Sequence, residues 1–214
     1  MRQRRSRSTI ALFAVPIATA LAIGLGAMRV PTKAPEDALS LRTDLTTRKL
    51  TVTRGSEVIK EYDVAVGKPQ YPTPRGTFSI RKIVWNPKWV PPDSKWAQGK
   101  REAAPGSARN PMKLVKIFFQ EPDYYIHGTD DMDSLGDAAS HGCLRMDPNE
   151  AGELALLLMD NDGVSRDWDW VKGILHLGSE RVVSLATPTP LTITDGSIAN
   201  NSTVATPTNL GRGM

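Results

Sequence analysis

Two short segments of this chain carry residues that could do covalent chemistry. Cys143 is the only cysteine, and two of the three histidines, His127 and His141, lie close to it in the sequence. A thiol near imidazoles is typical of a cysteine nucleophile with a general base beside it. With an ordinary pKa of about 8.5, such a thiol needs a neighbouring base or cation to react at neutral pH. The alternative is a buried cysteine that acts as a small apolar side chain.

The residues alone leave the identity of the base open. His127 ends a predicted strand and His141 precedes Cys143 by two positions, so either ring could face the thiol. His176 lies in a predicted helix, where a structural histidine is expected. His127, His141 and Cys143 are residue types that bind zinc, but no C-x-x-C or H-x-x-x-H spacing supports a zinc site. We expect no metal and no cofactor.

Two further residues near the thiol could contact a substrate. Gly142 lets the backbone approach a substrate carbonyl closely, and its amide together with that of Cys143 could form an oxyanion hole. Arg145 could hold a substrate carboxylate with two hydrogen bonds. Its alternative is a salt bridge with Asp147 or Glu150 at the start of the following helix.

The start of the chain predicts export. Four arginines, at positions 2, 4, 5 and 7, precede an uncharged run over 9–28, which is typical of a signal peptide or of a signal anchor that spans a bilayer. Either assignment of 1–30 places the rest of the chain outside the cytoplasm. We expect a protein of the periplasm or cell envelope, with membrane contact only through an anchor in the inner membrane. A free thiol in such a compartment favours a chemical role.

The charge balance argues against nucleic acid as a partner. The net charge is +4; of the 27 basic residues four lie in the N-terminal segment, and the other 23 equal the 23 acidic ones. A nucleic-acid-binding domain would be expected to carry a basic patch of its own.

The elements that must position these residues are mostly strands. Alternating patterns predict a hairpin over 50–53 and 58–66, and further strands over 77–84, 114–119, 124–127, 182–185 and 191–194. Helices are predicted over 148–159, with Asp147 as N-cap, and over 168–177, ended by Gly178. We expect one mainly β domain over 41–194, after a linker over 31–40 and before a polar, disordered tail over 195–214.

A tryptophan-containing insertion separates two of the predicted strands. Trp85, Trp89 and Trp96 lie among prolines and could wall a groove, or pack a loop onto the sheet. The crowding of small residues over 99–108 suggests a mobile flap as a hypothesis.

At the histidine and cysteine segments the chain resembles L,D-transpeptidase catalytic domains of the YkuD type. The family signature is matched by His127-Gly128-Thr129 and by Ser140-His141-Gly142-Cys143-Leu144-Arg145. The likeness covers roughly 41–194 and includes Gly67-Lys68, 73–78 and 110–112. One departure is Lys113, where the family often has glycine. The resemblance implies a β-sandwich with a few short helices.

The resemblance also implies a reaction. Cys143 would attack the carbonyl between the third and fourth residues of a peptidoglycan stem tetrapeptide, release D-alanine and form a thioester. His127 would activate the thiol, the Gly128 carbonyl would orient its ring, and His141 would be auxiliary. An amine of another stem would then attack the thioester to give a 3-3 cross-link.

The resemblance further implies that Ser140 and Arg145 would shape the substrate groove and give it charge.

The sequence leaves two other functions open. An L,D-carboxypeptidase would hydrolyse the same thioester with the same residues, and a non-catalytic peptidoglycan-binding domain would not need the free thiol.

Overall fold

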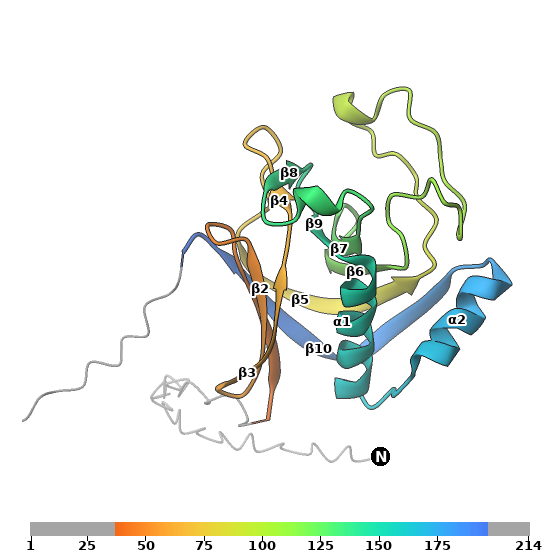
Figure 1. The fold of residues 1–214 in the computed structure, drawn as a ribbon. Coiled ribbons are helices and arrows are strands. Elements are labelled where there is room, and N and C mark those ends of the chain that lie inside the picture. Colours follow the sequence, from red (N-terminus) through yellow and green to blue (C-terminus); the bar gives the residue numbers. More distant parts are fainter. Residues whose placement is uncertain (1–36, 197–214) are drawn as a thin grey trace, which may run out of the picture. The chain divides into compact units, whose positions relative to one another are not determined.

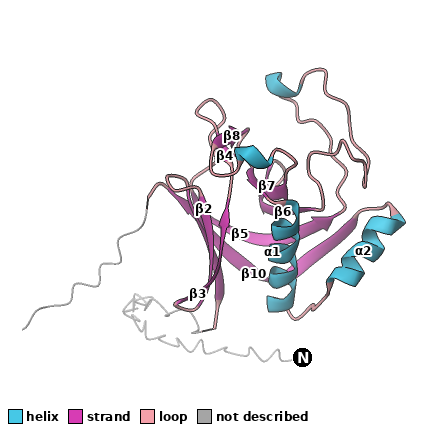
Figure 2. Ribbon diagram, in the orientation of Figure 1, coloured by secondary structure: helices cyan, strands magenta, loops and turns pink. Residues whose placement is uncertain are grey.

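The computed structural model describes residues 37–196, so the predicted signal segment over 1–30 and nearly all of the predicted tail lie outside the described residues. Eight strands form one continuous sheet in the order β3-β2-β1-β10-β5-β6-β7-β9, and β4 pairs with β8 in a separate small sheet. Figure 2 shows the two α-helices that accompany the sheet. The expected mainly β fold with a few short helices is confirmed.

The described residues form the strands β1 (Leu39–Asp44), β2 (Lys49–Arg54), β3 (Glu57–Asp63), β4 (Val66–Gly67), β5 (Gly76–Trp85), β6 (Val115–Gln120), β7 (Tyr124–Gly128), β8 (Ala138–Ser140), β9 (Leu144–Met146) and β10 (Arg181–Thr194). The helices are α1 (Pro148–Asn161), α2 (Trp168–Leu177) and two short 3₁₀ turns, η1 (Lys95–Ala97) and η2 (Met132–Ser134).

The two ends of the eight-stranded sheet are joined by a single pair of hydrogen bonds. Just beyond β3, the amide of Ala65 donates to the carbonyl of Arg145 in β9, and the amide of Arg145 donates to the carbonyl of Ala65, each at 2.9 Å. The sheet therefore curls into a nearly closed barrel (Figure 1). As a result β9, the strand that follows Cys143, is held along both of its edges.

Alternation along β6, β7 and β9 separates the core from a polar face. The core side chains of these strands are fully or nearly fully buried: Val115, Ile117, Phe119, Ile126, Leu144 and Met146. They belong to one hydrophobic cluster with Leu154 and Leu158 of α1. Because successive side chains of a strand point to opposite faces, the residues between them must face the other way. Several of these outward-facing residues are the ones with chemical potential.

Both helices begin and end as local chemistry predicts. The Asp147 carboxylate accepts from the amides of Asn149 at 2.7 Å and Glu150 at 3.1 Å, which caps α1. In α2, Asp167 accepts from the Trp170 amide, and Gly178 takes φ +67° at the C-cap. The two predicted helices are confirmed, with α1 ending two residues later than expected.

The structure departs from the predicted strands at both ends of the domain. Leu39 and Ser40 belong to β1 and not to a linker. The two predicted C-terminal strands are one strand, β10, whose register against β5 shifts between Ser184 and Thr189. There the Asp162 carboxylate accepts from the amides of Ala186 and Thr187. These two amides, which lie where the register shifts, therefore still have hydrogen-bond acceptors. Within residues 37–196 no helix is long and apolar enough to cross a membrane.

Asp147→Ala should lower the free energy of unfolding by about 1 kcal/mol, because it leaves two amides at the start of α1 without their acceptor. Equilibrium denaturation in urea measures this loss. Asp147→Asn keeps an acceptor oxygen and should lose less, so equal losses in the two variants would contradict the capping role.

Candidate active site

Three neighbouring strands bring the candidate residues side by side. Lys116 of β6 pairs with His127 of β7, and His127 pairs in turn with Arg145 of β9. Because Ile126 pairs with Leu144, the same register carried back one residue places Cys143 beside Tyr125. These residues alternate with the buried core positions and share the outer face of the sheet. His127 is thus flanked by a cation on each side.

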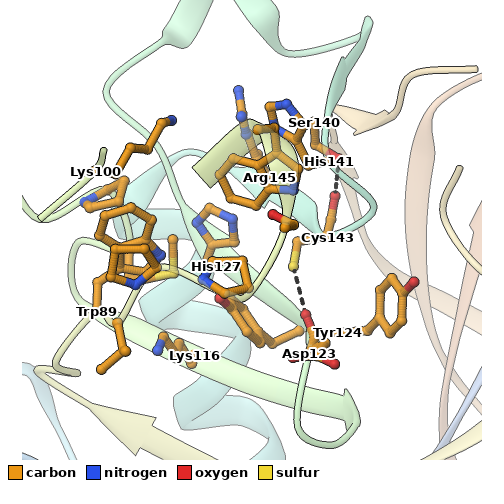
Figure 3. A pocket seen from close by; sticks show the side chains of 18 of the residues that line it. Trp89, Lys100, Lys116, Asp123, Tyr124, His127, Ser140, His141, Cys143 and Arg145 are labelled. Atoms are coloured by element: carbon orange, nitrogen blue, oxygen red, sulfur yellow. Dashed lines mark hydrogen bonds between the residues drawn. The ribbon is translucent and has the colours of Figure 1, made fainter. Parts of the chain in front are cut away.

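His127 is oriented by its own strand end. Its side chain is only 5% exposed, and its Nδ1 lies 2.7 Å from the Gly128 carbonyl oxygen. A carbonyl oxygen can only accept, so Nδ1 carries the proton and donates. Nε2 is therefore the unprotonated nitrogen and can take a proton from another group. Figure 3 shows the His127 ring and the Cys143 sulfur in the same pocket.

Gly128 is needed for close packing at the end of β7. A Cβ there would lie 2.9 Å from Cα of Pro148, at the start of α1, and 3.1 Å from Cβ of Lys113. Lys113 itself has φ +54°, a backbone conformation in which glycine is favoured. Its ammonium donates to Asp130 at 2.7 Å. Lys113 thus adopts a glycine-like conformation at a position where the family often has glycine.

The turn before β9 is fixed by the side chain of Ser140. Its buried hydroxyl donates to the Cys143 carbonyl at 2.6 Å and accepts from the Gly142 amide at 3.0 Å. Gly142 has φ +111°, and a Cβ there would lie 2.8 Å from the Tyr124 ring. Ser140 therefore shapes the turn, and Gly142 would have to release its bond to Ser140 before its amide could serve an oxyanion.

The thiol of Cys143 is hydrogen-bonded to a backbone carbonyl and not to the predicted base. Sγ donates to the Asp123 carbonyl oxygen at 3.3 Å, drawn as a dashed line in Figure 3. Within the described part of the chain no hydrogen bond joins Cys143 to His127. The sulfur must therefore release the Asp123 carbonyl before its proton can pass to the ring.

Burial sets the charge state of both groups. It raises the pKa of the Cys143 thiol to about 11, although the Tyr125 amide, Lys116 and Arg145 all favour the thiolate. Burial also lowers the pKa of His127 to about 4; Arg145 and Lys116 add to this effect, while the Gly128 carbonyl opposes it. At neutral pH the free site therefore holds a thiol beside a neutral imidazole, not an ion pair. The neighbouring cations do not activate the thiol by themselves.

His141 has a different environment. Its ring stacks on Trp96 with centroids 4.1 Å apart and lies 5.0 Å from the Tyr71 ring. Burial, reinforced by Lys68, lowers the pKa of His141 to about 4, so this ring is also neutral at pH 7. Its contacts join the turn before β9 to the loop that carries Trp96, and its auxiliary role stays a prediction.

The tryptophan insertion is only partly as predicted. Trp89 and Trp96 line the pocket from the loop between β5 and β6, and Trp89 pairs through its backbone with Ala103. Trp85 does not belong to that loop: it ends β5 in the core, where its indole Nε1 lies 3.3 Å from Sδ of Met159. The mobile flap over 99–108 stays a prediction.

The pocket has a volume of about 800 Å³ and combines charged with aromatic walls. The Arg145 guanidinium lies 3.7 Å from Asp131, so the alternative of a salt bridge with Asp147 or Glu150 is wrong. The sequence did not single out Lys116 or Tyr125. Their only signal was an alternating position in strands next to His127. Across residues 37–196 no three metal-ligating side chains come together as an ion site.

Comparisons with known proteins converge on one family. The sequence profile of the YkuD family, described as the L,D-transpeptidase catalytic domain, matches residues 40–171. The chain is 30% identical over 125 residues to a candidate L,D-transpeptidase, YkuD, of Bacillus licheniformis, a match that covers 58% of this chain and 63% of the relative. It is 33% identical over 113 residues to a candidate L,D-transpeptidase, YqjB, of Bacillus subtilis, covering 50% and 59%.

These matches span less than two thirds of the length of either relative. Among solved structures, an L,D-transpeptidase from Mycobacterium smegmatis superimposes with a TM-score of 0.47 at 18% identity, over 73% of this chain and 58% of that one.

Alkylation of Cys143 in the free protein should be slow at neutral pH. With its pKa raised to about 11, the thiol should react with iodoacetamide roughly two orders of magnitude more slowly at pH 7 than a model cysteine. The rate should rise about tenfold per pH unit up to about pH 10. Unfolding in urea should restore the ordinary rate, because burial, aided by the charge of Asp123, raises the pKa only in the folded protein. A rate that is already constant between pH 6 and 7 would identify a preformed thiolate and contradict this charge state.

Proposed function

The chain belongs to the YkuD family of L,D-transpeptidase catalytic domains, and from this we propose that it is an exported cysteine acyltransferase that cross-links peptidoglycan stem peptides. One observation carries the proposal. The register of β7 against β9 puts a histidine with an unprotonated Nε2 and the only thiol of the chain into one pocket. The predicted export segment over 1–30 supports a periplasmic or cell-envelope location.

In the first half-reaction the thiol becomes a thioester. The Cys143 proton passes to Nε2 of His127 as the sulfur attacks the carbonyl carbon of the third residue of a stem tetrapeptide. The bond from this carbon to the nitrogen of D-alanine then breaks, and His127 returns the proton to the leaving amine. The acyl group stays on the sulfur. The Gly128 carbonyl holds the ring through Nδ1–H at each proton transfer.

In the second half-reaction an amine takes the place of the sulfur. The acceptor amine, on the third residue of another stem, attacks the thioester carbonyl while His127 accepts its proton. The carbon–sulfur bond breaks, the proton returns to the sulfur, and the free thiol is restored. The product is a 3-3 cross-link. Water in place of the amine would give an L,D-carboxypeptidase instead.

The proposed cycle starts with Cys143 as a thiol and His127 as a neutral imidazole. Both groups are neutral, so the proton moves only when the sulfur has left the Asp123 carbonyl and attacks. General-base catalysis of this kind needs Nε2 within about 3 Å of the proton that it takes, and apo geometry is often looser than that. Arg145 lies beside His127 and would exchange Asp131 for a carboxylate of the stem.

Incubation of the protein with purified tetrapeptide muropeptides should yield cross-linked dimers and free D-alanine, resolved by liquid chromatography and mass spectrometry. Cys143→Ser should give neither product, because the hydroxyl is a much weaker nucleophile beside a neutral imidazole. Tripeptides without dimers would identify the carboxypeptidase. Unchanged tetrapeptides with the unmodified chain would refute both enzymatic functions.

His127→Ala should abolish thioester formation on Cys143, whereas His141→Ala should reduce its rate only severalfold. Intact-protein mass spectrometry after rapid mixing with the tetrapeptide measures the acyl adduct. Added imidazole should restore acylation in His127→Ala, since it can replace the missing base, and should have no effect on His141→Ala. If imidazole restored acylation only in His141→Ala, His141 and not His127 would be the general base. Melting curves check that both variants fold.

A further inference from the structure

Lys116 is a cation built into the wall of the catalytic pocket. It is half-buried on β6 and pairs with His127, and Figure 3 shows both side chains around the cavity that also holds Cys143. Its Nζ donates to the Lys88 carbonyl at 2.9 Å and lies 5.0 Å from the centre of the Tyr125 ring. A carbonyl and an aromatic face fix the position of the ammonium without neutralising its charge.

Charged groups lie around Lys116, but none forms a salt bridge with it among the described residues. Glu180 attracts it, and the Glu180 carboxylate accepts a hydrogen bond from the Lys88 amide. Lys82, on β5, repels it and is paired with Glu121. Cys143 carries no charge at neutral pH. No salt bridge of Lys116 occurs within the described residues, and burial lowers the pKa of its ammonium. An unpaired, partly desolvated cation is unfavourable unless an anion joins it during function.

We propose that Lys116 binds the C-terminal carboxylate of the donor tetrapeptide, which is the carboxylate of the leaving D-alanine. This assignment rests on the proposed function. It makes Lys116 a specificity residue, which selects stems that end in a free acid one residue beyond the carbonyl attacked by Cys143.

The strand register favours this carboxylate over others in the stem. Cys143 precedes β9, Lys116 lies on β6, and β7 runs between them. In the proposed arrangement the scissile carbonyl lies at the sulfur and the peptide crosses β7, so that its next group is directed toward β6. The terminal carboxylate is only three bonds from that carbonyl, so the long lysine side chain is suited to meet it. Arg145 lies on the other side of His127 and is left for a carboxylate of the preceding part of the stem.

The test combines a change in the protein with a change in the substrate. The kcat/KM for release of the fourth residue is measured with a tetrapeptide that ends in a free acid and with its C-terminal amide. Lys116→Met, which keeps the aliphatic stem, should lose about 10- to 100-fold with the acid and little with the amide. Lys116→Arg should retain the preference for the acid. Lys82→Met is the matched control and should leave it unchanged, because Lys82 is paired outside the pocket.

Equal losses on acid and amide with Lys116→Met would overturn the proposal, since they would show that Lys116 acts on the thiolate and not on the substrate. Binding of the two peptides to Cys143→Ala, by calorimetry, separates this failure from failure of the proposed function. If Cys143→Ala binds the acid more tightly than the amide, and the double variant with Lys116→Met loses this preference, the carboxylate site is supported even when the unmodified chain is inactive. Binding that does not distinguish acid from amide, or no binding at all, refutes it.

Discussion

The site depends on the parallel pairing of β7 with the three residues of β9. Leu144 and Met146 are fully buried, and alternation then forces Cys143 and Arg145 onto the opposite face, next to β7. The hydrogen bonds to Ala65 hold the other edge of β9, so this short strand cannot slip in register. A shift by one residue would bury the thiol and expose the core. Positioning of the nucleophile is therefore enforced by burial of its neighbours.

The same enclosure decides which protonation states are available. Two cations close to Cys143 would lower the pKa of an exposed thiol, yet burial outweighs them and raises it. At His127 burial and the two cations act in the same direction, and only backbone carbonyls oppose them. The free site is consequently neutral at both reacting groups. Any reactivity must then come from the substrate and from release of the sulfur by the Asp123 carbonyl, because neither group is charged in the free site.

Local chemistry explains what the sequence could predict. The capping carboxylate of Asp147, the C-cap glycine of α2 and the alternation of β6 and β7 are each readable within a few residues. The continuity of β10 could not be predicted, because Pro188 suggests a break. The two hydrogen bonds that the distant Asp162 accepts from Ala186 and Thr187, just before Pro188, have no local signal in the sequence. Lys116 likewise looks like any lysine on the outer face of a strand; only the register reveals that it lies beside His127.

Lys116 and Arg145 act on the two reacting groups in opposite ways. Each favours the thiolate of Cys143, and each disfavours the imidazolium of His127 that must form when the thiol loses its proton. Their opposing effects partly cancel in the free site, where Arg145 lies near Asp131 and Lys116 has no salt bridge among the described residues. Under the proposed function, a carboxylate of the stem bound at either cation would reduce the repulsion at His127, and the incoming carbonyl would take up the electron pair of the sulfur as the proton moves. Substrate binding and thiol activation would then be coupled through the same two side chains.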